Sequence, residues 1–468
     1  MALLNRVIPK GKRNEKMKTV RVVLCLVVCL MLVSSVWAKT TPPPPTTNPK
    51  PITMSIREDY DKGMNLATQV NPDFAMMNDL GVSTMVVSFG WDDYEPSHDV
   101  YDWTWLHSFC TAAAGYGIQL RPYICYTPTW ASSNGSWNGH PLDFQDWYDF
   151  CYNLSSQMAS HSNVVSFEIW NEWNDAFWFD ESGGTAFTDY VNLLTTGVSA
   201  IRAAQSGKQI ELGGLVWAHY EAIAACTNGT IETNYEIVNL HNYKETWPRT
   251  DALEGYFDAQ YTAWFVPCIQ NNGQGEPIWF NECGYSTEGR TEANQANWHA
   301  RAVFYLLADA TSLDKVQHYT CYEIKDLDPN TPAIGDTNNY HLGVSTYLRV
   351  PKTAYYTMKV LYGFFNGKTC QGRDNKVVLT VTSGRAGVKY SHLITDSTGA
   401  AYLLVYDKTK TVTYRANITG IPATSCVKYA LDGTQTPWTG GNFTPGTNPI
   451  VYNIACTPGN VWMFKLTP

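Results

Sequence analysis

Between residues 52 and 365 the chain alternates short apolar runs with longer amphipathic stretches, and this alternation constrains the fold more than any other feature. The apolar runs are rich in Val, Ile and aromatic residues and do not alternate strictly with polar residues, as expected for strands buried on both faces. Eight strands are predicted, at 52–57, 83–89, 119–126, 164–170, 209–217, 235–241, 277–282 and 315–324. Eight strand–helix units of roughly 39 residues each predict an α/β fold, the (β/α)8 barrel.

The sequence pattern changes after residue 366. Short apolar strands, punctuated by Gly, Asn, Pro and Asp, follow one another without helical periodicity. Seven are predicted, at 376–382, 389–395, 401–407, 411–418, 425–431, 449–455 and 460–466. We therefore expect a catalytic barrel over 52–365 and a C-terminal antiparallel β-sandwich over 366–468.

The N-terminus carries the pattern of an export signal. Basic residues precede an apolar run at 22–32, and Val36 and Ala38 stand where signal peptidase requires small residues. Residues 1–38 are therefore predicted to be a cleaved signal peptide. The alternative is an uncleaved membrane anchor, because the apolar stretch 22–38 reaches the lower limit for a spanning helix.

Further features favour a secreted, extracellular protein, with the cell wall or cell surface as possible sites. Residues 39–51 form a linker rich in Pro and Thr, which cannot pack a core. Five sequons for N-glycosylation follow, at Asn134, Asn153, Asn228, Asn417 and Asn442. An oxidising compartment favours disulfides, and the expected pairs are Cys110–Cys151, Cys226–Cys268 and Cys426–Cys456. Cys125, Cys283 and Cys321 are expected to be free thiols.

Charge and composition exclude several kinds of partner. The net charge is −9, and since the first 38 residues hold seven Lys/Arg and one acidic residue, the remainder carries −15. Such a chain binds phosphate backbones poorly, so we expect no nucleic acid. There is no CxxC, HExxH or His/Cys cluster, which predicts no metal and no cofactor. We expect a monomer, with contact to a membrane only if the signal is an uncleaved anchor.

Two glutamates stand at the ends of predicted barrel strands, where the functional side chains of such barrels lie. The fourth strand ends in FEIWNEWN, with Asn171 and Glu172, and the seventh ends in IWFNECGYS, with Glu282. Retaining glycoside hydrolysis requires two such carboxyl groups on rigid elements, one protonated and one ionised. Either glutamate alone would be interpreted as a loop cap or salt-bridge partner. The pair, in apolar surroundings where unpaired charge is costly, points to catalysis.

At these residues the chain resembles clan A of the glycoside hydrolases, most closely the family of β-xylosidases and α-iduronidases and more loosely cellulase-like families. The resemblance spans about residues 52–365. Its segments are 90–132, 167–179, 238–243, 279–286 and 322–365. The chain departs from the pattern at Tyr322 and Glu323, where many relatives have Trp, at Cys283 and Gly284 after Glu282, and at Trp173, where Pro is common.

The resemblance implies roles for five residues. Glu172 would be the general acid/base and Glu282 the nucleophile. Asn171 would bind the sugar 2-hydroxyl, an interaction that strengthens in the transition state. His241 and Tyr243 match positions flanking the nucleophile, where a Tyr hydroxyl can orient the Glu282 carboxylate and keep it ionised. The alternative for His241 and Tyr243 is ordinary packing at a strand end.

Other residues near the strand ends have a less specific pattern. Trp91, Trp130 and Trp178 are expected to be platforms for the flat faces of sugars, which favours a poly- or oligosaccharide substrate. Glu168 is expected to be structural, paired inside the barrel with Arg57 or Arg121.

The sequence thus predicts a secreted retaining glycosidase. The alternatives are a catalytically silent carbohydrate-binding barrel and a membrane-anchored cell-wall transglycosylase. The polysaccharide, its linkage and the choice between endo and exo cleavage remain open at this stage.

Overall fold

The computed structural model describes residues 48–180, 186–216, 232–247, 253–265, 267, 276–308, 316–330 and 337–468. The predicted signal peptide, the sequon at Asn228 and the predicted pair Cys226–Cys268 lie outside these residues. Within the part of the chain that is described, no helix is both long and apolar enough to cross a membrane.

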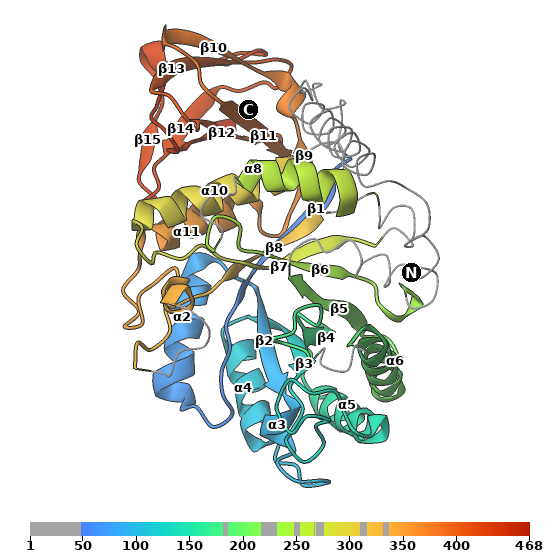
Figure 1. The fold of residues 1–468 in the computed structure, drawn as a ribbon. Coiled ribbons are helices and arrows are strands. Elements are labelled where there is room, and N and C mark those ends of the chain that lie inside the picture. Colours follow the sequence, from blue (N-terminus) through green and yellow to red (C-terminus); the bar gives the residue numbers. More distant parts are fainter. Residues whose placement is uncertain are drawn as a thin grey trace, which may run out of the picture. The chain divides into compact units, whose positions relative to one another are not determined.

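Eight parallel strands form a closed barrel, as the sequence predicts (Figure 1). The strands are β1 (Lys50–Arg57), β2 (Thr84–Gly90), β3 (Gln119–Cys125), β4 (Ser166–Asn171), β5 (Gln209–Val216), β6 (Val238–Asn242), β7 (Ile278–Cys283) and β8 (Val316–Tyr322). Neighbours pair in chain order, and β1 also pairs with β8, which closes the barrel. Strands β4, β6 and β7 are buried along their whole length.

The register of the strands brings the predicted site residues to one end of the barrel. Arg57, the last residue of β1, is aligned with Tyr322 of β8. His241 of β6 is aligned with Glu282 of β7, next to a register shift. Because parallel strands end on the same side, the side chains that follow them converge.

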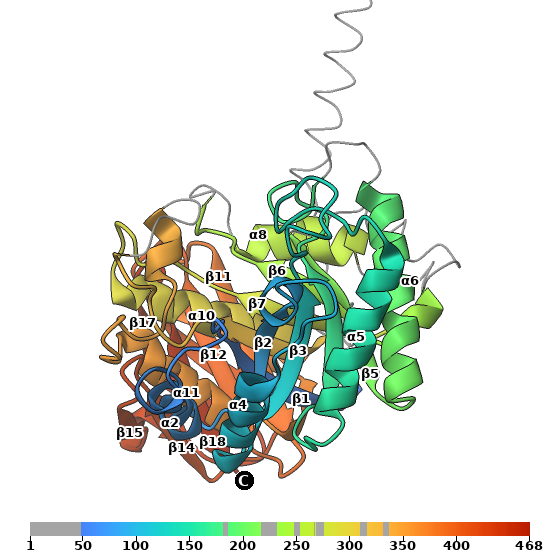
Figure 2. The same ribbon diagram turned by 90° about the horizontal axis from the view of Figure 1, so that it is seen from below.

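Helices surround the barrel, with α4, α5 and α6 outside the strands in Figure 2. They are α2 (Asn71–Leu80), α3 (Trp91–Tyr94), α4 (Thr104–Gly115), α5 (Phe144–Met158), α6 (Ala186–Ala204), α8 (Leu253–Tyr256), α10 (Glu292–Ala308) and α11 (Thr353–Phe365), with shorter or irregular helices η1 (Leu66–Val70), η2 (Glu232–Asn234), η3 (Phe257–Phe265), η5 (Thr337–His341), η6 (Asp374–Lys376) and η7 (Gly440–Asn442). The longer ones match the amphipathic stretches of the sequence. Helix α5 illustrates why: Trp147, Phe150, Cys151 and Leu154 recur on one buried face, and the Asp143 carboxylate caps the first turn.

The C-terminal region is a two-sheet sandwich, as predicted. Its strands are β9 (Lys368–Gly372), β10 (Val377–Gly384), β11 (Lys389–Asp396), β12 (Ala401–Asp407), β13 (Val412–Ile418), β14 (Ser425–Tyr429), β15 (Gln435–Pro437), β16 (Phe443–Thr444), β17 (Ile450–Cys456) and β18 (Trp462–Thr467). One sheet has the order β15-β14-β18-β12-β11-β9 and the other β10-β13-β17-β16. Strand β9 pairs antiparallel with the start of β1. Lys50 and Pro51, expected in the linker, therefore belong to β1.

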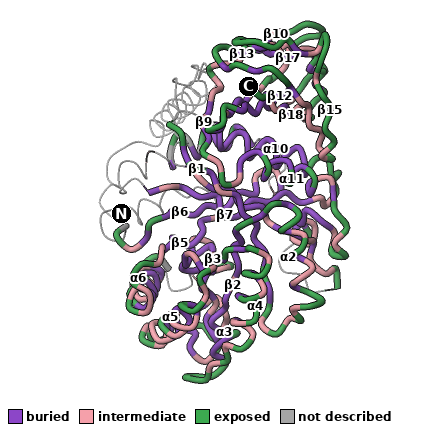
Figure 3. Tube along the Cα trace, turned by 180° about the vertical axis from the view of Figure 1, so that it is seen from behind, coloured by how far each residue is buried: buried purple, intermediate pink, exposed green. Residues whose placement is uncertain are grey.

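The described residues form two apolar cores. The larger fills the barrel and the layer between strands and helices, where Figure 3 shows the central strands as buried, and it continues onto the sandwich through residues such as Tyr402 and Leu404. The smaller lies between the sheets of the sandwich, around residues such as Leu403, Tyr414 and Phe464. Helix α10 packs against β9 and β11, so the sandwich sits on the barrel through this helix.

The predicted disulfides Cys110–Cys151 and Cys426–Cys456 are wrong, because all four thiols are free. All four thiols are buried. The Cys151 sulfur packs toward Gly197 of α6, whereas Cys110 lies on α4, and Cys426 and Cys456 belong to different sheets. The thiols fill space as small apolar side chains. The prediction that Cys125, Cys283 and Cys321 are free is confirmed.

Candidate active site

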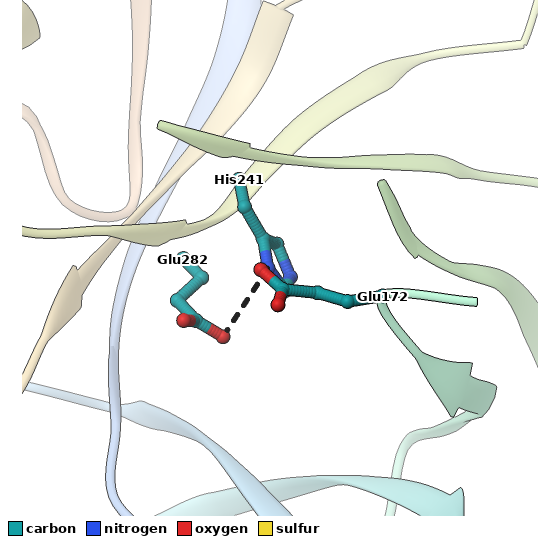
Figure 4. Close-up of side chains that lie close together, drawn as sticks. All are labelled: Glu172, His241 and Glu282. Carbon is teal, nitrogen blue, oxygen red and sulfur yellow. Dashed lines mark hydrogen bonds and ion pairs between the residues drawn. The ribbon is translucent and has the colours of Figure 1, made fainter. Parts of the chain in front are cut away.

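Glu172 and Glu282 meet at the mouth of the barrel. Figure 4 shows both carboxylates directed to the same space, with the His241 ring beside them. One oxygen of each carboxylate and one ring nitrogen of His241 all lie within 4.8 Å of one another. Glu172 directly follows β4 with a left-handed φ of 45°, and its N–H donates to the Gly214 carbonyl at 2.8 Å. Such backbone strain in a non-glycine residue concentrates at functional sites.

Glu282 is surrounded by donors. Arg57 Nη1 forms an ion pair with Glu282 Oε2 at 2.9 Å, and His241 Nδ1 lies 3.5 Å from the same oxygen. The Tyr243 hydroxyl donates to the other oxygen, Glu282 Oε1. Burial and the nearby Glu172 raise the pKa of Glu282 above its ordinary value, and Arg57, His241 and the Tyr243 hydroxyl limit this rise. The arrangement favours an ionised carboxylate held in one orientation.

Fewer of the groups around Glu172 stabilise a negative charge on its carboxyl group. Burial raises its pKa to about 8, and the charge of Arg57 and a hydrogen bond from Trp178 only partly oppose this effect. Its Oε1 lies 2.6 Å from His241 Nδ1. A carboxyl group with this pKa is mostly protonated at neutral pH and can donate a proton.

His241 lies between the two carboxyl groups and is neutral, since burial lowers its pKa to about 4. Arg57 Nη1 lies 3.4 Å from Nε2, and a guanidinium only donates. We infer that Nε2 accepts, which leaves the proton on Nδ1, facing Glu172. A Cβ on Gly214 would lie 2.1 Å from Nε2, so the ring fits only because residue 214 is glycine.

Arg57 is the residue of the site whose place the sequence reasoning missed. Its Nη2 donates to Asn171 Oδ1 at 2.8 Å, and its guanidinium lies 3.9 Å from the centre of the Tyr123 ring. It thus fixes Asn171 and Glu282 together. In the sequence Arg57 ends the first predicted strand as Glu282 ends the seventh, yet this pattern alone predicts Arg57 only as a partner for Glu168.

Tyr243 owes its position to a second glycine. A Cβ on Gly284 would lie 2.6 Å from Tyr243 Cε1. The Tyr243 ring packs edge-on against Tyr322 and Trp247, with centroids at 6.0 and 5.0 Å. Tyr322, noted as a departure at the end of the eighth strand, therefore lies beside the site, and a cis peptide bond joins it to Glu323.

The three predicted tryptophan platforms differ from one another. Trp91 is fully buried and donates to Glu95 Oε2 at 2.6 Å, so its prediction as a platform is wrong. The physical reason is that α3 begins at residue 91 and turns the indole into the helix layer. Trp130 is partly buried, meets Trp91 edge-on and donates to the Glu95 carbonyl at 3.0 Å. Trp178 alone lies beside a glutamate of the pair, since it hydrogen-bonds Glu172.

Further aromatic side chains gather around Trp178. Tyr126 stacks on it at 6.4 Å, and Trp137 and Phe177 meet it edge-on at 5.7 and 5.1 Å. Phe177 is 49% exposed. These residues lie on long loops after β3 and β4, and in the sequence nothing distinguishes them from other loop aromatics.

Glu168 has a structural role, as predicted, but with other partners. Its oxygens accept from the Gly214 N–H at 2.7 Å and from Asn281 Nδ2 at 2.9 Å. Arg121 pairs instead with Glu211 at 2.7 Å. Burial raises the pKa of Glu168 to about 8 despite the charge of Arg57, which favours the protonated form at neutral pH.

Glu172, His241 and Glu282 are also the one group among the described residues whose donor atoms could together hold a metal ion. Their surroundings do not favour a cation. Arg57 already provides a positive charge 2.9 Å from Glu282 and points a nitrogen at His241. A divalent ion placed there would be repelled by a guanidinium that cannot lose its proton.

A family model described as beta-galactosidase matches residues 59–141, a segment that contains neither Glu172 nor Glu282. No curated protein matches the chain. Among solved structures, the chain is similar to a monomeric beta-xylosidase from Caulobacter crescentus CB15, with 14% identity, a TM-score of 0.62, and coverage of 90% of this chain and 98% of that chain.

Two further structures are similar over comparable lengths. The GH39 enzyme of Xanthomonas axonopodis pv. citri has 14% identity and a TM-score of 0.61, covering 90% of this chain and 96% of that one. A glycoside hydrolase family 30 subfamily 8 xylanase from Clostridium acetobutylicum has 12% identity and a TM-score of 0.60, covering 90% and 97%. The predicted resemblance to glycoside hydrolases is confirmed at the level of the fold, over barrel and sandwich alike.

Proposed function

We propose that the protein is a retaining glycoside hydrolase, with Glu282 as nucleophile and Glu172 as general acid/base. The observation that carries this proposal is the pair of carboxyl groups with oxygens within 4.8 Å at the barrel mouth. Retaining enzymes hold their carboxyl groups about 5–5.5 Å apart, whereas inverting enzymes need about 6.5–9.5 Å to admit a water.

The chemistry proceeds in two displacements. Glu282 attacks the anomeric carbon while Glu172 gives its proton to the departing oxygen, so the glycosidic C–O bond breaks as a glycosyl ester forms. Glu172, now ionised, then takes a proton from water, which attacks the anomeric carbon and releases Glu282. Asn171, oriented through Oδ1 by Arg57, is placed to bind the 2-hydroxyl of the sugar.

The substrate is a carbohydrate, and xylose-containing chains are the first candidates. This choice is supported by two structures of similar fold, which are a beta-xylosidase and a xylanase. The aromatic group around Trp178 adds a surface for further sugar units beside the acid/base.

We also propose that the protein is secreted and monomeric. N-terminal sequencing of the exported form would test secretion, and light scattering would test the oligomeric state.

The direct test is to replace the nucleophile. Glu282→Ala should lower kcat on an aryl glycoside by at least about 10⁴-fold. Azide should restore turnover by occupying the vacated space and forming a glycosyl azide of inverted configuration. Glu288→Ala, which removes a glutamate 38% exposed outside the site, is the control and should leave activity unchanged. An active Glu282→Ala enzyme would refute the proposal.

The acid/base role has its own signature. Glu172→Ala should lower kcat far more on substrates with poor leaving groups than on aryl glycosides with activated leaving groups. Activated leaving groups depart without receiving a proton. Equal losses on both substrates would contradict the role given to Glu172. Loss of activity on dialysis against EDTA would instead favour the metal site formed by the same residues.

A further inference from the structure

The backbone that follows Tyr243 is held from outside the barrel. Thr246 N–H donates to the Tyr243 carbonyl at 2.9 Å and closes a turn, in which Glu245 has a left-handed φ of 72°. Arg290 Nη2 donates to the carbonyls of both Glu245 and Thr246 at 2.7 Å. Glu245 thus lies within the turn that directly follows Tyr243, whose hydroxyl is directed to Glu282.

The side chain of Glu245 pairs with Arg301 of α10. Arg301 Nη1 and Nη2 lie 3.2 and 3.0 Å from its two oxygens, a bidentate pair. The Leu253 N–H donates to Glu245 Oε1 at 2.9 Å, at the start of α8. The same guanidinium is shared, since Arg301 Nε also donates to Glu254 Oε1 at 2.7 Å.

Glu254 is fully buried and receives two donors from the sandwich. The Tyr406 hydroxyl, on β12, donates to Oε1 at 2.8 Å, and Lys408 Nζ, just after β12, donates to Oε2 at 2.6 Å. Lys408 Nζ also lies 3.8 Å from Glu245 Oε1. A continuous run of contacts thus leads from the sandwich to the turn after Tyr243.

The charges of this network balance, with two carboxylates and two cations. Although burial raises the pKa of Glu254, Arg301 and Lys408 bring it down to about 2. Without Lys408, both carboxylates would depend on Arg301. Glu254, which has no exposed surface, needs the guanidinium more than Glu245, which is 18% exposed. Arg301 would then shift toward Glu254 and loosen the turn.

We propose that Lys408 and Tyr406 of the sandwich are positioning residues for Tyr243, and through it for Glu282. This inference rests on the proposed function. It makes the sandwich part of the catalytic unit rather than an appended module.

The test compares two lysines of the sandwich in the full-length protein. Lys408→Met should lower kcat about tenfold with KM changed less than about twofold, and should move the acid limb of the pH profile upward, because a weaker Tyr243 hydrogen bond raises the pKa of Glu282. Lys408→Arg should recover most of kcat. Lys368→Met is the matched control: it breaks an ion pair with Asp396 at 3.5 Å, remote from the network, and should leave kcat and the pH profile unchanged.

The route through Tyr243 is tested by coupling. In a Tyr243→Phe background, Lys408→Met should cause no further loss of kcat, since the hydroxyl to be positioned is gone. Tyr406→Phe, which removes only a hydroxyl, should give a loss of about threefold with the same shift of the acid limb, and serves if Lys408→Met folds poorly. An equal loss in both backgrounds, or a lower melting temperature with unchanged kcat and pH profile, would overturn the inference. Failure of the proposed function is seen separately, as an active Glu282→Ala enzyme.

Discussion

The ends of β4 and β7 each carry a glutamate with 10% of its side chain exposed, yet the two regions differ in what surrounds the carboxyl group. Glu282 at β7 receives a guanidinium at 2.9 Å and a phenol hydroxyl. Glu172 at β4 faces a neutral imidazole and an indole, with no cation in direct contact among the described residues.

The two groups have the same residue type and the same burial, so the neighbouring side chains decide which carboxyl group is protonated and which is ionised. Burial raises the pKa of both groups, to about 8 at Glu172. The pKa of Glu282 is raised less, because Arg57, His241 and Tyr243 oppose the effect of burial there. One carboxyl group is thereby prepared to donate a proton and the other to attack.

Removing Arg57 should abolish most of this difference and has the largest expected effect. Arg57→Met should lower kcat/KM by about 10²–10³-fold and shift the acid limb to higher pH, because Glu282 loses the cation that favours its charge. Arg121→Met is the control: it removes another barrel arginine, with 11% of its side chain exposed against 2% for Arg57, whose partner is Glu211. If both variants lose activity equally, stability rather than charge explains the loss.

Adding one methyl group on either side should perturb the two regions separately. Gly284→Ala pushes Tyr243 and should lower kcat about 10- to 100-fold with an upward shift of the acid limb. Gly214→Ala pushes His241 and should change the basic limb. Gly363→Ala, in α11 with open space around it, should be silent. Identical pH profiles for Gly284→Ala and Gly214→Ala would contradict the division.

The pH profile of kcat/KM should itself show the division. Glu172 acts protonated, so activity falls as the pH rises through its pKa of about 8. Glu282 acts ionised, so activity falls as the pH drops through its own, lower pKa. Glu172→Gln should remove the basic limb and keep the acid limb. A basic limb that persists in this variant must come from another group.

The sequence predicts which residues stand at the barrel mouth, but it does not predict whether each side chain points into the site or into the surrounding helix layer. The sequence pattern marks the ends of the barrel strands clearly. The side chains predicted there, at Glu172, His241, Tyr243 and Glu282, do converge. Trp91 also follows a strand but begins a helix, and this turn into the helix layer has no signal in the pattern.

Arg57 shows a second limit. A strand-end arginine can face down the barrel toward Glu168 or up toward Glu282, and only the packed structure decides. The same holds for the thiols: Cys110 and Cys151 lie within α4 and α5, not at helix ends as the sequence pattern suggests, and the packing leaves both thiols free.

The smallest expected effect concerns the aromatic group beside Glu172. Trp137→Ala should raise KM for an oligosaccharide about two- to tenfold while leaving an aryl monosaccharide glycoside unaffected, since stacking contributes only where a further sugar is bound. Trp91→Ala, a buried residue, should instead lower the melting temperature. A larger effect on the aryl glycoside than on the oligosaccharide would contradict the proposal that the aromatic group around Trp178 binds further sugar units.

The central claim, that the two glutamates perform a double displacement, is tested most directly by the configuration of the first product. Proton NMR during hydrolysis of an aryl glycoside, recorded before mutarotation, identifies the anomer that is released. The carboxylate spacing within 4.8 Å predicts the anomer with the configuration of the substrate. Release of the opposite anomer would contradict the account.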